Sequence, residues 1–231
     1  MTAILSLDTT SKYSSLAVAG DGDIQIEFNF FTRDDLSATL IPAIAGVLNS
    51  GSTPIKLSDI DVFGIAVGPG LFTGIRVGLA ALKGLLLGQK KPVVPVVTLE
   101  ALAYKCREPG FTTISMIDAR RDEVYIAGYN FLENKTGEVI PPGLLHISQL
   151  KERLGKDERF YFVGSGAEAH EAFIRENFSR ARIGRRSFFL APEISKIAYD
   201  RYKEKDFISD LQQLMPFYLR KPDAEQNLVK Q

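Results

Sequence analysis

Apolar runs separated by polar turns open the chain, and their order predicts a three-stranded antiparallel meander. Residues 4–7 are apolar and end at Asp8, and a second apolar run covers residues 14–19. Polar turn residues at 20–22 separate this run from a third one, residues 23–30. The third run has the strand period of two, since its apolar positions are Ile24, Ile26, Phe28 and Phe30.

Helical and strand patterns then alternate, which indicates a parallel sheet with crossover helices. The continuous apolar run at residues 62–67 fits a buried parallel strand. Pro42 lies inside a helical pattern and should bend that helix, and Thr73 is a candidate cap for the next one. The expected elements are a helix over 35–49, a strand over 62–67, a helix over 73–88, a strand over 93–97 and a helix over 98–106.

The pattern restarts at residues 113–117, an apolar run that again ends in an aspartate, Asp118. We therefore predict a duplicated α/β fold of two mixed-sheet halves, residues 1–108 and 109–231. By analogy this is the actin-like (ASKHA, ribonuclease H-like) organisation of sugar kinases and Hsp70. The further elements expected in the second half are strands over 124–131, 160–163 and 217–219, and helices over 148–154, 167–177 and 191–203.

The composition limits the classes of function. Lys and Arg number 28, as do Asp and Glu, so an RNA contact must be local or shared with a partner. A single cysteine, Cys106, excludes an internal disulfide framework, and His146 and His170 are too far apart in sequence to suggest a zinc site. The N-terminus lacks a signal-peptide pattern and no apolar stretch suits a membrane span, so we expect a cytoplasmic protein.

Two local patterns could carry chemistry. Asp8 ends a strand as the phosphate-binding aspartate does in kinases of this fold, but no glycine follows until Gly20. The alternative is that Asp8 and Asp118 shape tight turns. The motif at residues 68–74, GPGLFTG, joins a strand to a helix N-terminus and offers N–H groups to an anion, although such turns are commonly structural. The candidate anion or nucleotide contacts are Asp8, Gly68, Gly70, Thr73 and Arg76.

The helix over residues 75–87 is apolar around nearly its whole circumference. Such a helix must be buried on all sides, either within the chain or partly against a second protein. A dense basic segment, residues 175–186, could contact phosphate or form a solvated loop. No nucleophile–base pair for a hydrolase can be assembled.

The chain resembles the TsaB (YeaZ) family from end to end. Residues 4–9 (ILSLDT) look like the opening of TsaB proteins, and residues 67–78 (VGPGLFTGIRVG) are similar to their G-P-G-S-F-T-G-L-R-I-G signature. Residues 99–102 (LEAL), 118–125 (DARRDEVY) and 216–220 (PFYLR) also match. Leu71 replaces the usual serine of the signature, and Leu36 stands where many TsaB proteins have histidine.

This resemblance implies a scaffold without catalytic residues or an intrinsic cofactor or metal. TsaB proteins pair with TsaD, which carries the metal and forms threonylcarbamoyladenosine at position 37 of tRNAs, and TsaE, an ATPase, joins them. ATP or ADP is thus expected on partner subunits, and tRNA contact is indirect. The same helical face serves homodimers and the TsaD pairing; here it corresponds to Leu36, Leu40, Ile44, Val47, Ile75, Leu79, Leu82 and Leu86.

The metal ligands of the related transferase are missing. TsaD-type subunits carry H-x-x-x-H after the strand that corresponds to residues 93–97, whereas this chain has Thr98 and Leu102 there. Neither side chain can replace an imidazole ligand. A free-standing ATPase or small-molecule kinase is the alternative function, and a peptidase the third.

Overall fold

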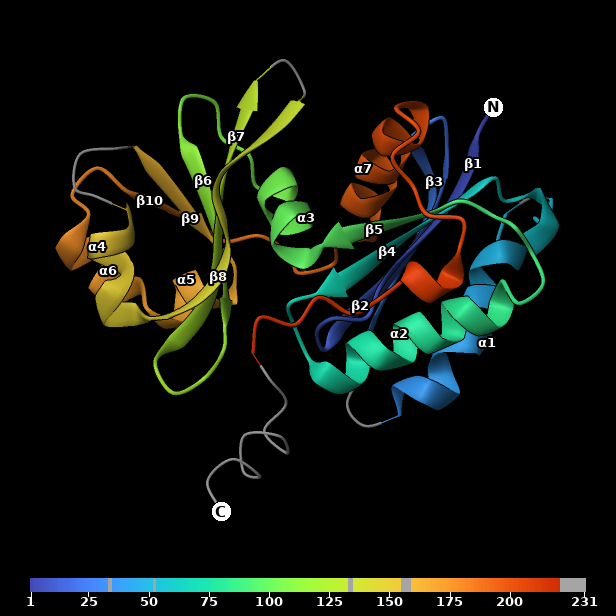
Figure 1. The fold of residues 1–231 in the computed structure, drawn as a ribbon, viewed down its shortest axis with the longest axis horizontal. Coiled ribbons are helices and arrows are strands. Elements are labelled where there is room, and N and C mark those ends of the chain that lie inside the picture. Colours follow the sequence, from blue (N-terminus) through green and yellow to red (C-terminus); the bar gives the residue numbers. More distant parts are fainter. Residues whose placement is uncertain (33–34, 52, 133–134, 155–158, 221–231) are drawn as a thin grey trace. The chain divides into compact units, whose positions relative to one another are not determined.

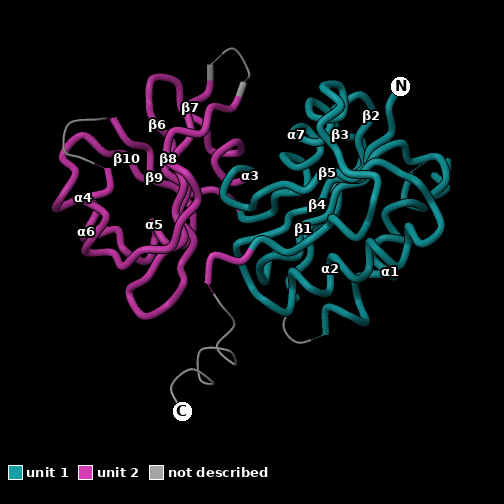
Figure 2. Tube along the Cα trace, viewed as in Figure 1, with its two compact units in different colours: residues 1–101, 188–217 teal, residues 102–187, 218–231 magenta. Residues whose placement is uncertain are grey.

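The computed structural model describes residues 1–32, 35–51, 53–132, 135–154 and 159–220. The chain divides into two compact units, coloured separately in Figure 2. Among the described residues, unit 1 contains residues 1–101 and 188–217, and unit 2 contains residues 102–187 and 218–220. The expected division at residue 108 differs from this one, because the segment 188–217 returns to unit 1 and completes it.

Unit 1 is built around a five-stranded mixed sheet with the order β3-β2-β1-β4-β5. The antiparallel meander precedes two parallel strands, as the alternation of patterns predicts. In Figure 1 α7 covers one face of this sheet, and α1 and α2 lie side by side on the other. The elements are β1 (Ala3–Asp8), β2 (Tyr13–Gly20), β3 (Asp23–Phe31), α1 (Leu36–Asn49), η1 (Leu57–Asp59), β4 (Val62–Gly68), α2 (Phe72–Leu85), β5 (Val93–Val97), α7 (Ala191–Lys203) and η3 (Leu211–Gln213).

Unit 2 repeats the plan with the sheet order β10-β9-β6-β7-β8. Its first three strands form an antiparallel meander, and β9 and β10 add in parallel beside β6. α3 (Thr98–Lys105) begins in unit 1 and ends in unit 2. The other elements are β6 (Thr112–Asp118), β7 (Glu123–Leu132), β8 (Lys135–His146), η2 (Ile147–Gln149), α4 (Leu150–Leu154), β9 (Phe160–Val163), α5 (Ser165–Ala169), α6 (Glu171–Asn177) and β10 (Arg182–Gly184).

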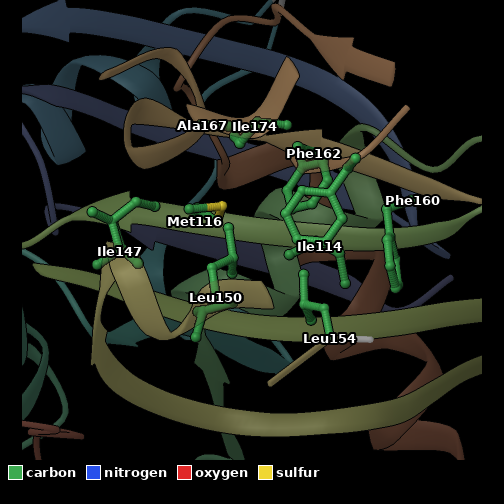
Figure 3. Packing of buried hydrophobic residues seen from close by; sticks show 12 residues of the cluster. Ile114, Met116, Ile147, Leu150, Leu154, Phe160, Phe162, Ala167 and Ile174 are labelled. Atoms are coloured by element: carbon green, nitrogen blue, oxygen red, sulfur yellow. The ribbon is translucent and has the colours of Figure 1, made fainter. Parts of the chain in front are cut away.

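The core of unit 2 forms where alternate residues of the central strands meet the helices. Ile114 and Met116 of β6 and Phe160 and Phe162 of β9 are buried against Leu150 of α4 (Figure 3). These positions are two apart, as one face of a strand requires. Burial of each large apolar side chain contributes about 1.5–3 kcal/mol to folding, so this layer stabilises the unit without any disulfide.

The fold prediction is confirmed, with local corrections. The two mixed sheets and their duplicated order are those expected from the repeated strand–aspartate pattern. Residues 217–219 form no strand, and the helix expected over 167–177 is two helices, α5 and α6. The strands β8 and β10 were not predicted. Among the described residues, no helix combines the length and apolarity needed to cross a membrane.

Candidate functional site

The loop that follows β1 is buried inside unit 1. Asp8, Thr9 and Thr10 are almost inaccessible to solvent. Oδ1 of Asp8 accepts hydrogen bonds from the backbone N–H of Thr10 at 2.9 Å and from its hydroxyl at 2.7 Å. Oδ2 of Asp8 is buried and has no hydrogen-bond partner among the described residues. Burial raises the pKa of this carboxyl to about 6, and the nearby Glu193 charge adds to the rise, while the two Thr10 bonds oppose it.

A row of glycines lets α2 lie directly on this loop. A Cβ at Gly70 would stand 2.3 Å from the Thr10 carbonyl oxygen, and one at Gly74 would stand 2.0 Å from that of Thr9. A Cβ at Gly78 would stand 2.2 Å from the Thr9 hydroxyl. The close approach allows the Thr9 hydroxyl to donate to the Gly74 carbonyl at 2.9 Å. These glycines of the α2 segment are therefore explained by packing against the loop.

The first turn of α2 differs from the expected capped turn. Thr73 was the expected cap, but the N-cap is Leu71, which has an extended backbone and makes no side-chain capping bond. The N–H of Leu71 instead donates to the Thr10 carbonyl at 2.6 Å. Thr73 and Arg76 are exposed, and the Arg76 guanidinium lies 3.8 Å from the centre of the Phe72 ring.

The structure divides the five expected anion contacts into two groups. Asp8 is buried, and Gly68 (φ 115°) lies against the chain, since a Cβ there would meet the Phe217 carbonyl oxygen at 2.7 Å. Gly70 is held against Thr10. Thr73 and Arg76 remain at the surface. Anion binding by this set stays a prediction, and the burial of Asp8 argues against a phosphate site in the loop.

The expected partner-binding residues are mostly internal. Leu36 is partly exposed, whereas the others are buried because they pack α1 and α2 onto the sheet and onto each other. These side chains hold the two helices in place, and partner binding through this set of residues stays a prediction. The residues concerned are Leu40, Ile44, Val47, Ile75, Leu79, Leu82 and Leu86.

The outer face of the α1–α2 pair is nevertheless apolar. α1 contains no charged residue over its 14 positions. Its Ile41 is 44% exposed, and Phe72 at the start of α2 is 38% exposed. Leu87, just beyond α2, is 82% exposed. We call the exposed residues of these two helices and their ends the α1–α2 face. Arg76 of α2 is the charged residue exposed within these two helices. An exposed face with several large apolar side chains is typical of a protein-binding surface.

Two glycines on this face have no close neighbour among the described residues that would require glycine. A Cβ at Gly46 of α1 or at Gly84 of α2 would meet nothing within 4 Å. Neither glycine has a positive φ. Glycine inside a helix costs about 0.5–1 kcal/mol relative to alanine. Their presence is explained if the backbone of another helix approaches closely at these points.

The corresponding turn of unit 2 is exposed and rich in arginine. Asp118 ends β6, and its Oδ1 accepts from the Arg120 N–H at 2.8 Å. Arg120, Arg121 and Asp122 are consecutive residues with left-handed φ values of 63°, 57° and 56°. Arg220 fixes the turn by donating to the Ala119 carbonyl at 2.8 Å. Among the described residues, no group of acidic, histidine or cysteine side chains is arranged to hold a metal ion.

The duplicated sheets and the sealed loop define an actin-like protein whose phosphate-loop position is filled by its own helix. The family described as "TsaD: tRNA N6-adenosine threonylcarbamoyltransferase" matches residues 32–230. The "tRNA threonylcarbamoyladenosine biosynthesis protein TsaB" of Escherichia coli is 30% identical over 94% of each chain, and that of Bacillus subtilis is 28% identical over 98% of each. The chain belongs to this family and, within it, to the TsaB (YeaZ) proteins.

Solved structures agree with the fold. A Pseudomonas aeruginosa protein described as similar to peptidase YeaZ has a TM-score of 0.80 and 23% identity, covering 95% of this chain and 100% of that one. An activator of 2-hydroxyisocaproyl-CoA dehydratase from Clostridium difficile, solved with ADPNP, has a TM-score of 0.51 and 12% identity, covering 88% and 97%. These similarities show the actin-like fold alone.

Sequence reasoning missed the residues that define the surface. Gly46 lies in a helix without a recognisable motif, and Gly84 was one small residue among several. The sequence of α1 could have indicated this surface, because the helix has no charged residue although more than half of its positions are exposed.

Proposed function

We propose that the chain is a non-catalytic subunit that docks a TsaD-type transferase through the α1–α2 face. It acts in the cytoplasm in forming threonylcarbamoyladenosine at position 37 of tRNAs, and TsaE joins through the same assembly. The observation that carries the proposal is the pair Gly46 and Gly84, at which an added Cβ would meet nothing, on an exposed surface that also presents Ile41, Phe72 and Leu87. The names of the curated relatives and of the matching family support the pathway.

The chemistry of the chain supports a docking role over catalysis. Asp8 would have to face a ligand in a kinase or ATPase, but it is buried behind α2. Thr98 and Leu102, at the positions of the expected transferase ligands, are both buried, and neither is a metal ligand of the imidazole type. ATP, ADP and the metal are therefore assigned to the partner subunits.

Docking on this face also accounts for its small residues. Two helices approach to about 8–10 Å between axes, and the nearer distances need small side chains at the contact. Gly46 and Gly84 provide such points, and Ile41 and Phe72 are larger exposed side chains on the same two helices. A second copy of the chain would use the same surface, so homodimer and heterodimer should compete.

Leucine substitutions at the two glycines test the proposal. Gly46→Leu and Gly84→Leu should leave folding intact or improve it, because the added side chain has free space and glycine is a poor helix former. Each should weaken co-elution with the transferase at least about tenfold, because a buried overlap costs about 1–3 kcal/mol. The measurement is size-exclusion chromatography with light scattering, followed by a titration of the TsaD-type subunit.

Ala172→Leu is the matched control, since Ala172 is exposed on α6 of unit 2. It should leave the association unchanged. Equal binding by the folded Gly46→Leu, Gly84→Leu and unsubstituted proteins would show that the α1–α2 face is not the docking site. Substitutions at Leu40 or Leu82 are poorer tests, because both side chains are fully buried and their loss would damage folding.

A further inference from the structure

A second surface, on unit 2, combines arginine and aromatic side chains. β10 lies at the edge of the sheet and pairs in parallel with β9, which places Arg182 opposite Tyr161. Phe111 comes immediately before β6, the strand on the other side of β9. Arg186 follows β10 closely along the chain. We call Phe111, Tyr161, Arg182 and Arg186 the arginine–aromatic strip.

Rings and guanidinium groups adjoin one another along this strip. The Arg182 guanidinium carbon lies 4.7 Å from the centre of the Phe111 ring. The Phe111 and Tyr161 rings are 6.5 Å apart at an interplanar angle of 65°. The charge of Arg186 acts on Tyr161, since it opposes the rise that burial causes in the pKa of the phenol. A Cβ at Gly184 would stand 2.1 Å from the Tyr161 hydroxyl oxygen, so the ring lies over the backbone of that glycine.

The strip is accessible and lies in the most basic part of the chain. The Arg182 side chain is 61% exposed, although it pairs with Glu108 at 3.0 Å. Residues 175–186 contain five arginines and one glutamate, in a chain whose charges balance. Exposed ion pairs such as Arg182–Glu108 contribute little to stability, so a phosphate can replace the carboxylate at low cost.

We propose that the arginine–aromatic strip binds a single-stranded segment of RNA. Guanidinium groups form bidentate bonds with phosphates, and unpaired bases stack on aromatic rings and on guanidinium planes. A double helix would offer phosphates but no free base faces, which makes the rings specific for single strands. This goes beyond docking of the transferase, because it gives the chain a direct contact with the nucleic acid on a different unit.

Binding to oligoribonucleotides by the isolated chain tests this inference. The probe is a fluorescein-labelled oligouridine of about 12 nucleotides at roughly 50 mM salt. The fluorescence anisotropy of this probe measures its binding. The double variant R182A/R186A should weaken binding at least tenfold and reduce the slope of log K against log salt by about 1.4, since each lost phosphate contact removes about 0.7. Phe111→Leu, which keeps apolar volume but removes the ring, should weaken binding about tenfold without changing that slope.

The control is R121A/R153A, which removes two exposed arginines of unit 2 outside the strip. Its binding should stay within about twofold of the unsubstituted chain if the strip is the site. Three outcomes would overturn the inference: no binding at low salt, an equal loss in the control, or equal affinity for duplex RNA. Co-elution with the transferase is measured separately, so failure of RNA binding leaves the docking proposal standing.

Discussion

At the end of β1, Asp8 is fully buried, whereas Asp118 at the end of β6, the equivalent strand of unit 2, is exposed. Both carboxylates accept the N–H two residues further along, at 2.9 and 2.8 Å. The same carboxylate–backbone hydrogen bond thus begins the turn in both units, although left-handed φ values occur only in the turn of unit 2. The units also differ in the segment that follows the fourth strand of each sheet.

In unit 1 that segment is α2, a helix of 14 residues that lies on the loop through its glycines. In unit 2 it is α5, which has five residues. Gly68 and Gly164 occupy equivalent positions and have φ values of 115° and 98°. The comparison teaches that the same strand order can either bury the loop beneath a long helix or leave the turn exposed.

The strongest test of this contrast adds a methyl group to α2. Gly74→Ala would place Cβ 2.0 Å from the backbone oxygen of Thr9 and disturb the 2.9 Å bond between them. We expect a loss of about 4 kcal/mol in the free energy of unfolding, measured by urea titration. Gly84→Ala on the same helix should instead gain roughly 0.5–1 kcal/mol. Similar losses for both variants would refute the packing explanation.

Asp8→Asn tests the buried carboxyl. The pKa of Asp8 is about 6 in the folded chain and 3.8 when unperturbed, so the folded state binds the proton more tightly. Stability should therefore fall as pH rises from about 4 to 6, by an amount on the order of 3 kcal/mol.

The Asp8→Asn substitution removes the cost of burying an ionised carboxylate, but the buried amide still lacks some hydrogen-bond partners. The net gain at about pH 7.5 should be roughly 1–2 kcal/mol, and it should disappear near pH 4. Thermal unfolding of both proteins across this range measures the difference. Asp118→Asn serves as the comparison and should change stability by less than about 0.5 kcal/mol, because its side chain is exposed. A gain for Asp8→Asn that does not vary with pH would contradict the account.

The smallest expected effect concerns the open turn. Arg121 has a φ of 57°, a region that costs a side-chain-bearing residue about 1 kcal/mol. Arg121→Gly should therefore stabilise the chain by roughly 0.5 kcal/mol after the entropy cost of glycine. Lys12→Gly, in the loop of unit 1 where φ is not positive, should destabilise by a similar amount. Calorimetry can measure both changes in stability. A loss of stability in Arg121→Gly would show that the turn is unstrained.

Much of the fold could be predicted because the local periodicity of apolar residues indicates each strand and helix. The strand period around β3 and the helix at residues 191–203 were found from the pattern alone. β8 was missed because its 12 residues include Pro141, Pro142 and Gly143, which ordinarily interrupt strands. The return of residues 188–217 to unit 1 was also missed, since local patterns do not encode which sheet a helix covers.

The site was harder to predict because its features depend on neighbours in space. The motif at residues 68–74 was read as a possible anion loop, whereas Gly70 and Gly74 approach Thr10 and Thr9. Both Asp8 and Asp118 end an apolar run, so the run alone does not distinguish the buried carboxylate from the exposed one. The helices of the α1–α2 face were identified, but the residues chosen were those of its inner side.

The late position of α7 has a consequence for biosynthesis. Sheet strands of unit 1 are made first, yet Leu190 and Ala191, whose N–H groups donate to Ser15 of β2, leave the ribosome only near the end of translation. One face of β1, β2 and β4 therefore stays uncovered until then. The nascent chain consequently depends on its last quarter to hide its first strands, which makes premature termination a direct route to aggregation.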